Sequence, residues 1–292
     1  MSKNCNDGSD KRPYLRLDIN YGNCNELPEF SKGPKGNDEE KHSLIKSAGF
    51  EGIQDGIPRL CEEYGLGLTA HARINQVGEL SQLAPVWKSQ GFDCATIHLG
   101  WGIETDREVD LLVEDVLNTS MKLDFPIYLE THRATVTQDM QRTVALTERF
   151  PEIRFNGDFS HWYTGQEMVY GGIEMKWDFI QPIFERVRFL HGRIGNPGSI
   201  QVDIGDGLGL TYVEHFKEMW TRSFVGFLQS AQKGDFICFT AELLPASIYY
   251  ARNIILPNGE VQEEGDRWRQ AILLNEIAKS CWQEAESRLS LS

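Results

Sequence analysis

Short apolar runs alternate with longer amphipathic stretches along most of the chain. Eight runs read as strands, because each is rich in β-branched, aromatic or leucine residues and is bounded by Gly, Pro or polar residues. They cover residues 14–19, 50–54, 66–71, 94–99, 127–130, 153–158, 187–191 and 236–242. Strands that alternate with helical segments in this way predict an α/β protein with a parallel sheet.

The segments between the runs carry helical signals. The clearest one starts at Thr105, the expected N-cap, with Glu108 as its capping-box partner and apolar residues in the i, i+3, i+4 rhythm behind it. Thr137 is expected to cap a second helix over 137–150. The other predicted helices cover 38–48, 58–64, 80–87, 177–185, 213–227 and 266–284.

Loop lengths distinguish the two ends of the predicted sheet. Junctions that lead from a helix into a strand are short and contain a Gly or Pro, whereas the loops 20–37, 162–176, 192–212 and 243–264 that follow strands are long. Eight strands, eight helical segments and this asymmetry predict a single-domain (β/α)8 TIM barrel over residues 14–292 that includes a C-terminal helix. Residues 1–13 are expected to form a disordered or tag-like tail. The active site of such a barrel lies at the C-terminal ends of the strands.

Composition narrows the class of protein. A formal charge of -14 and a pI near 5.0 disfavour nucleic acid and anionic membranes as general partners. The six cysteines show no CxxC spacing, which argues against a zinc knuckle or a disulfide framework. The start of the chain has no apolar signal region and no run is long enough to span a membrane, so a cytoplasmic protein is expected. Dimers are common for barrels of this kind, so a homodimer is considered, but no feature of the sequence specifies the oligomeric state.

Four of the predicted strands end on an ionisable residue. Glu130, Asp158, His191 and Glu242 stand at consecutive strand ends on the catalytic side of the barrel. A buried charge is costly unless it is compensated, and a divalent cation compensates three carboxylates and one imidazole together. The mixture of oxygen and nitrogen donors favours Mn²⁺, with Mg²⁺, Co²⁺ or Zn²⁺ as alternatives.

The strand-end order Glu, Asp, His, Glu, with Asp158 and His161 in a D-x-x-H element, resembles the xylose isomerase-like TIM barrels, in particular the tagatose 3-epimerase and hydroxypyruvate isomerase branch. The run Phe50-Glu51-Gly52-Ile53 resembles the second-strand signature of that family. The resemblance implies a metal held by Glu130, Asp158, His191 and Glu242 and a carbohydrate substrate, a keto-sugar or related polyol. It implies an isomerase or epimerase in which Glu130 and Glu242 move a proton through a metal-stabilised enediolate.

Two positions depart from the pattern of the epimerase branch. Val136 stands where those relatives carry a second glutamate, and Ser199 stands where they carry an arginine after Pro-Gly. Arg193 is the residue expected to replace that arginine. The substrate itself is therefore not specified by the resemblance.

Further residues are expected around the metal. His161, His98, His71, Arg193 and Trp162 are the candidate substrate-binding residues. Trp101 and Tyr250 are candidates for an apolar floor, and His132 or Arg133 for binding an anionic group or supporting a ligand. His42 and His215 lie on predicted helices and are expected to face solvent.

Three other readings share part of this pattern. A lyase or dehydratase on a keto-polyol, of the inositol-catabolism type, would begin with the same proton abstraction on the same barrel. A DNA-repair endonuclease would need a richer set of histidines and glutamates, together with a basic groove. A non-catalytic sugar-binding relative would keep the fold without turnover.

Overall fold

The fold is a closed barrel of eight parallel strands. A computed structural model describes residues 3–291. The barrel strands are β2 (Tyr14–Asn20), β3 (Gly52–Gln54), β4 (Gly67–Ile74), β5 (Cys94–Leu99), β6 (Ile127–Glu130), β7 (Phe155–Gly157), β8 (Val187–Gly192) and β9 (Asp235–Ala241). Each strand pairs in parallel with the next, and β9 closes the barrel by pairing with both β8 and β2. The predicted (β/α)8 TIM barrel is confirmed.

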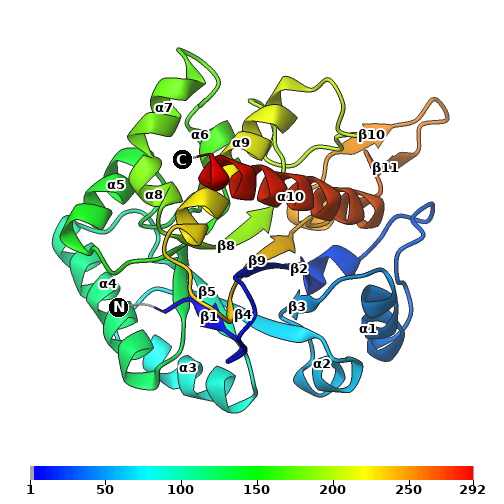
Figure 1. The fold of residues 1–292 in the computed structure, drawn as a ribbon. Coiled ribbons are helices and arrows are strands. Elements are labelled where there is room, and N and C mark those ends of the chain that lie inside the picture. The colour runs from blue at the N-terminus through cyan, green and yellow to red at the C-terminus, as the bar shows by residue number, and fades with distance from the viewer. Residues whose placement is uncertain (1–2, 292) are drawn as a thin grey trace.

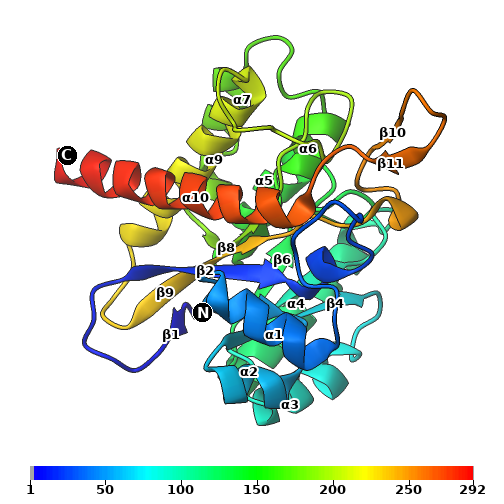
Figure 2. The same ribbon diagram turned by 90° about the vertical axis from the view of Figure 1, so that its right-hand side faces the viewer.

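Helices cover the outside of the barrel (Figure 1). They are α1 (Asp38–Ser47), α2 (Pro58–Tyr64), α3 (Leu80–Ser89), α4 (Asp106–Leu123), α5 (Met140–Arg149), α6 (Ser160–Gly165), α7 (Ile173–Phe179), α8 (Gln181–Phe184), α9 (Thr211–Leu228) and α10 (Arg267–Ser290). Figure 2 shows α10 lying along one side of the molecule, where it packs on α9 and β9. Apolar side chains of the strands and of the inner helix faces form one large buried cluster.

Several predicted helices have different boundaries from those expected, and α10 ends at Ser290 rather than near residue 284. Asp139, not Thr137, caps α5, and its side chain accepts a hydrogen bond from Arg142 N. Thr137 instead hydrogen-bonds the backbone carbonyl of Glu130 and so ties the following loop to the end of β6. The segment expected as one helix over 177–185 is divided at Ile180 into α7 and α8, and Pro182 stands in the first turn of α8, where a proline is favoured.

The N-terminal segment is ordered from Lys3 onward, which corrects the expected tail. Cys5–Asn6 forms β1, which pairs antiparallel with the start of β9, and Cys5 is 1% exposed. The side chains of Asn4 and Asn6 both donate hydrogen bonds to Asp235. A two-residue strand has no sequence periodicity, so polar composition alone suggested disorder. Met1 and Ser2 lie outside the described residues.

Two further expectations concern buried residues. His42 is completely buried in α1, where its ring hydrogen-bonds Asp38 O and accepts from Ile57 N, so its expected exposure was wrong. All six cysteines are free and buried, and the burial of Cys94 and Cys238 was expected from the apolar runs around them. Between residues 3 and 291, no helix combines the length and apolar character needed to cross a membrane.

The loops after the strands add smaller elements near the catalytic end. They include η1 (Tyr21–Cys24) after β2, and η2 (Ala246–Ile248), β10 (Asn253–Ile255) and β11 (Val261–Glu263) after β9. The antiparallel β10–β11 hairpin projects from the body of the barrel in both views (Figures 1 and 2).

Candidate active site

The four residues expected to bind a metal come together at the C-terminal ends of adjacent strands. Glu130 ends β6, Asp158 follows β7, His191 lies near the end of β8 and Glu242 follows β9. One donor atom from each lies within 4.8 Å of the other three. His191 Nδ1 lies 3.2 Å from Glu242 Oε2, 3.4 Å from Glu130 Oε2 and 3.9 Å from Asp158 Oδ2. All four residues are buried.

The orientation of His191 follows from a hydrogen-bond network beneath it. Gln54 Nε2 donates to Thr96 Oγ1, which directs Gln54 Oε1 toward Asn20 and His191. Because an amide oxygen only accepts, His191 donates from Nε2 at 2.9 Å and presents Nδ1 to the carboxylates. Partners of this kind fix the ring orientation of a metal ligand.

Two asparagines hold the outer glutamates. Asn156 Nδ2 donates to Glu130 Oε2 at 3.1 Å, and Asn20 Nδ2 donates to Glu242 Oε1 at 3.3 Å. Sequence reasoning missed both asparagines and Gln54. Asn20 and Gln54 are the last residues of β2 and β3. The signal was thus the same one that identified the charged residues, a polar side chain at the end of an apolar run.

The electrostatics of the cluster differ from residue to residue. Burial alone would lower the pKa of His191, but Glu242 and Glu130 raise it to about 9. Burial raises the pKa of Glu242, against the opposing effects of His191 and Arg193. Burial would also raise the pKa of Glu130, but His98 and His191 hold it well below its usual value. The pKa of Glu242 is therefore raised and that of Glu130 is lowered, although the two residues lie in one site.

Arg193 is buried inside the cluster of candidate metal ligands. Its residue is 1% exposed, its Nη2 contacts Glu242 Oε2, and the same nitrogen lies 3.6 Å from Asp158 Oδ2. Arg193 Nε also donates to Glu242 O at 3.1 Å. Its Nη1 is buried and has no hydrogen-bond partner within residues 3–291. The guanidinium of Arg193 therefore lies beside two of the four candidate metal ligands, Asp158 and Glu242.

A row of four imidazoles lines the rest of the site. Ring centroids are 4.4 Å apart for His71 and His98, 3.8 Å for His98 and His132, and 3.7 Å for His132 and His161. Burial and the neighbouring His98 lower the pKa of His71 to about 3, and burial and His161 lower that of His132 to about 2. Burial likewise lowers the pKa of His161. The rings of His71 and His132 are therefore neutral at pH 7.

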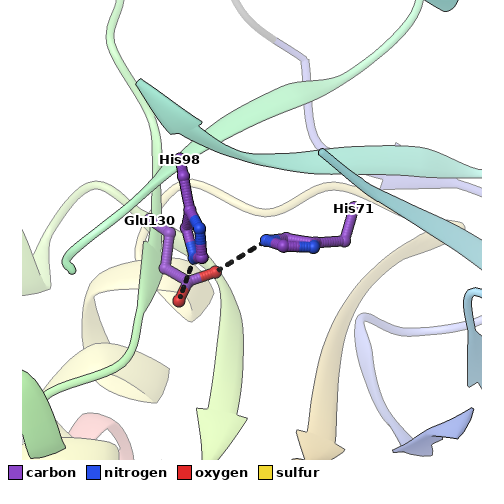
Figure 3. A group of neighbouring side chains, drawn as sticks. All are labelled: His71, His98 and Glu130. Atoms are coloured by element: carbon purple, nitrogen blue, oxygen red, sulfur yellow. Dashed lines mark hydrogen bonds and ion pairs between the residues drawn. The ribbon is translucent and has the colours of Figure 1, made fainter. Parts of the chain in front are cut away.

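Two of the expected substrate ligands lie against Glu130. His98 Nε2 is 3.0 Å from Glu130 Oε1, and His71 Nε2 is 4.0 Å from Glu130 Oε2. Figure 3 shows both rings directed at the carboxylate. His161 lies on the other side of the cluster, with Nε2 3.4 Å from Asp158 Oδ2. Both of its ring nitrogens are buried, and neither has a hydrogen-bond partner in the part of the chain that the structure describes.

The aromatic residues expected in the mouth have different positions. Trp162 is completely buried, packs against Phe159 and donates from Nε1 to Thr137 O at 2.9 Å. It is a packing residue and offers no exposed face to a substrate, which corrects that expectation. Tyr250 lies close to the guanidinium groups of Arg193 and Arg133, at 4.4 and 5.2 Å from its ring centroid.

His132 and Trp101 complete the surroundings of the mouth. The ring of His132 hydrogen-bonds Arg133 O through Nδ1, and its Nε2 lies 3.4 Å from Tyr250 OH. Trp101 is 52% exposed and stacks with the guanidinium of Arg73. The mouth thus combines a buried polar cluster with a rim that carries aromatic and arginine side chains.

Solved structures share this architecture. A xylose isomerase-like TIM barrel protein from Mycobacterium smegmatis, in complex with magnesium, is 12% identical, with 92% of this chain and 96% of that chain covered and a TM-score of 0.55. The probable 3-DHS dehydratase AsbF from Bacillus anthracis, involved in petrobactin synthesis, is 14% identical, with 78% and 92% covered and a TM-score of 0.51. A family 2 AP endonuclease from Brucella melitensis is 14% identical, with 79% and 92% covered and a TM-score of 0.47.

No protein-family model matches the chain, and no curated protein matches its sequence. At identities of 12% and 14%, the structural likeness establishes the fold alone. The chemistry has to be argued from the site.

Proposed function

We propose that this chain, which has the fold of the xylose isomerase-like TIM barrels, is a divalent-metal-dependent isomerase or epimerase of a keto-sugar or related polyol. The observation that carries the proposal is the convergence of Glu130, Asp158, His191 and Glu242 at one mouth of the barrel. This mouth is the end at which barrels of this type bind their substrates.

The donor set fits a divalent metal. Asp158 Oδ2 is buried and has no hydrogen-bond partner among residues 3–291, and the Arg193 guanidinium lies 3.6 Å away, beyond hydrogen-bond distance, so this oxygen is still available to a metal ion. Glu130, Asp158, His191 and Glu242 would hold the ion, and their three carboxylates and one imidazole suit Mn²⁺ first, with Mg²⁺, Co²⁺ or Zn²⁺ as alternatives. When bound, the cation polarises a carbonyl and offsets negative charge that develops on its oxygen.

Arg193 is compatible with that ion. Each carboxylate has two oxygens, and Arg193 contacts Oε2 of Glu242, whereas Oε1 accepts a 3.3 Å hydrogen bond from Asn20. Glu242 can therefore be shared between a guanidinium and a cation. The partnerless Nη1 of Arg193 remains to donate to a substrate oxygen.

The opposite pKa shifts of the two glutamates suggest their roles. Because burial raises its pKa, Glu242 is the better group to accept a proton from the carbon beside the carbonyl. Glu130 stays ionised, since His98 and His191 outweigh its burial. Return of the proton to the neighbouring carbon completes an aldose–ketose isomerisation, and return to the opposite face of the same carbon completes an epimerisation.

A lyase is the second candidate, and one feature favours it. His161 is completely buried beside Asp158 and has two ring nitrogens without a hydrogen-bond partner. A general acid in this position would protonate a departing hydroxyl after the same proton abstraction, so that water leaves. The fate of the hydroxyl separates the two reactions.

The several histidines also resemble the donor set that a zinc-dependent endonuclease needs. The formal charge of -14 opposes binding to a phosphate backbone, because nucleic-acid affinity depends on basic surfaces that displace counterions. The small-molecule reaction is therefore the better account of the site.

Solvent-deuterium exchange into a panel of keto-sugars and keto-polyols tests the proposal, with and without added Mn²⁺. Deuterium is expected at a carbon beside the carbonyl only when Mn²⁺ is present, and the labelled product identifies an isomer, an epimer or a dehydrated compound. Glu242→Gln is expected to reduce exchange by roughly 10²–10⁴-fold. Glu218→Gln, which removes a carboxylate on α9 outside the barrel, is the matched control. Wild-type exchange in Glu242→Gln would refute the role of Glu242.

A further inference from the structure

We infer that the chain has a second ligand site, for a phosphate group, at the N-terminal end of the barrel, where Arg154, Arg186 and Arg188 lie together. The proposed function uses none of these residues, because the candidate metal ligands stand at the opposite ends of the strands. The ligand would be a phosphate ion or the phosphate group of a small monoester, since both present the same chemistry to the protein.

The three arginines line one hollow in the surface. Arg154 directly precedes β7, Arg186 directly precedes β8, and Arg188 is the second residue of β8. Because β7 and β8 pair in parallel, their starts lie side by side. Glu185, which follows α8, and Ser230, which follows α9, also line the hollow. Its volume of about 280 Å³ is near the lower end of the range for small-molecule sites, about 300–1,000 Å³.

The positive charge at the hollow is not balanced by carboxylates. Neither Arg154 nor Arg188 has a carboxylate within 4.0 Å among residues 3–291, and Nη1 of each donates to two backbone carbonyl oxygens. Arg186 Nη1 donates to Pro182 O and lies 3.9 Å from Glu185 Oε2. Glu185 is exposed, so this ion pair contributes little. A carbonyl oxygen is a neutral acceptor and leaves the charge of a guanidinium in place.

Arg188 is the buried base of the site. The residue is 3% exposed, its Nε donates to Asn4 Oδ1 at 2.7 Å, and its Nη2 donates to Ser230 Oγ at 2.9 Å. Burial and the charge of Arg154 lower the pKa of Arg188 to about 10, against a smaller opposing effect of Asp235. Arg188 therefore stays charged at pH 7 beside a second cation. An anion in the hollow would offset the repulsion between them.

Two of the arginines keep donors available for a ligand. Arg186 Nε is buried and has no hydrogen-bond partner in the described part of the chain, which is unfavourable unless an acceptor lies beside it. Nε and Nη2 of Arg154 likewise make no hydrogen bond among residues 3–291. These two nitrogens form one edge of the planar guanidinium, and such an edge matches two oxygens of a phosphate. Arg154 is therefore suited to bind a phosphate through two hydrogen bonds, with Arg186 beside it.

The charge of the ligand follows from the number of arginines. A phosphate group carries about 1.5 to 2 negative charges at pH 7, so one group balances two guanidiniums, whereas a carboxylate balances one. A long polyanion such as a nucleic acid is disfavoured by the formal charge of -14 on the whole chain. A single phosphate group on a small molecule, or the free ion, needs only the local positive charge.

Calorimetric titration of the purified protein with inorganic phosphate tests the inference, with sodium chloride adjusted to hold the ionic strength constant, because salt screens exposed charges. Wild-type protein is expected to bind about one phosphate per chain. Arg154→Gln and Arg186→Gln each remove charge-assisted hydrogen bonds and should weaken binding by roughly 10–100-fold. Arg154→Lys keeps the charge without the planar edge and should lose part of that affinity. Arg222→Gln, which removes an arginine of α9 paired with Glu218, is the matched control and should bind as the wild type does.

Titration with glycerol phosphate distinguishes the two sources of the group. Tighter binding than that of inorganic phosphate would identify a monoester, and weaker binding the free ion; both results retain the site. Two outcomes overturn the inference. One is no saturable phosphate binding by wild-type protein, and the other is wild-type affinity in both Arg154→Gln and Arg186→Gln, which would show that these arginines serve only their carbonyl acceptors.

Circular dichroism of each variant shows whether a lost ligand reflects a lost site or a lost fold. The outcome is also independent of the proposed reaction. Phosphate binding without any deuterium exchange would retain this inference and refute the isomerase or epimerase. Deuterium exchange without phosphate binding would do the reverse.

Discussion

The guanidinium of Arg193 and the carboxylate of Glu242 form an ion pair inside the barrel mouth, where the two residues are 1% and 7% exposed. A further contact of 3.6 Å joins the same guanidinium to Asp158. Two of the four candidate metal ligands therefore already have a cationic neighbour supplied by the chain itself. The stability of the protein without metal should depend on this neighbour.

Arg193→Ala tests that dependence. Removal of one partner from a buried ion pair leaves the other charge uncompensated and typically costs roughly 3–5 kcal/mol. We expect a loss of this size in the free energy of unfolding of metal-free protein, together with a larger rise in Tm on addition of Mn²⁺ than in the wild type. Thermal unfolding with and without Mn²⁺ measures both. Arg222→Ala, which removes a more exposed arginine on α9, is the control. Equal Mn²⁺-induced rises in Tm for Arg193→Ala and wild type would contradict the prediction.

The raised pKa of His191 predicts a pH dependence for metal-free protein. Its folded value of about 9 lies above the ordinary value of 6.5, so the protonated ring contributes stability that is complete below pH 6.5 and is lost as the pH rises through 9. A shift of this size corresponds to about 3 kcal/mol. The difference in unfolding free energy between wild type and His191→Gln should shrink by that amount over this window. Parallel pH profiles of the two proteins would argue against the assignment.

His161→Ala is expected to weaken substrate binding. The buried ring has two unpartnered nitrogens beside Asp158, and loss of one hydrogen bond to substrate costs about 1–1.5 kcal/mol, or roughly tenfold in affinity. We expect a roughly tenfold rise in KM with a smaller change in kcat for an isomerase. A collapse of kcat with unchanged KM would instead identify His161 as the proton donor of a lyase. His215→Ala serves as the control.

Gln54→Leu tests the network that orients His191. The substitution removes the acceptor for His191 Nε2 and the donor to Thr96 Oγ1 while it keeps a similar side-chain volume. Loss of such a supporting partner typically lowers metal affinity by roughly 10–100-fold. Calorimetric titration with Mn²⁺ measures the affinity of each variant. Gln270→Leu is the control, because it removes a buried glutamine that hydrogen-bonds Ile204 N and Gly205 O at another place in the fold. Unchanged Mn²⁺ affinity in Gln54→Leu would show that His191 is oriented by the carboxylates alone.

The N-terminal strand should contribute stability without affecting the metal centre. Deletion of residues 1–9 removes the buried Cys5 and the hydrogen bonds from Asn4 and Asn6 to Asp235, a loss of roughly 2–4 kcal/mol. Urea unfolding measures this loss. Mn²⁺ affinity should not change, because β1 pairs with the start of β9 and the site lies at the strand's other end. A deletion variant with weaker Mn²⁺ binding would contradict the separation of the two ends.

The strands and four central residues of the site could be predicted because the same local pattern marks them. An apolar run that closes on Glu130 or Glu242 signals both a buried strand and a charge at its end. The same reasoning applies to Asn20 and Gln54, but an uncharged polar side chain at a strand end is a weaker signal than a charged one. Their role emerged only from the hydrogen bonds that link strands distant in sequence.

The incorrect predictions concern residues whose burial is determined by tertiary contacts. Trp162 follows the D-x-x-H element in sequence, yet the short helix α6 turns its ring into the core. His42 lies on a polar helix, but its ring is completely buried and accepts a hydrogen bond from Ile57 N, which precedes α2.

The antiparallel pairing of Cys5 with Phe236 also bears on how the protein is made. During synthesis, the first strand leaves the ribosome long before its partner in β9 exists, and β2 waits for the same partner. Each keeps an unpaired edge until β9 (Asp235–Ala241) has emerged, and unpaired edges of this kind invite aggregation. Chaperone demand should therefore be greatest just before β9 appears.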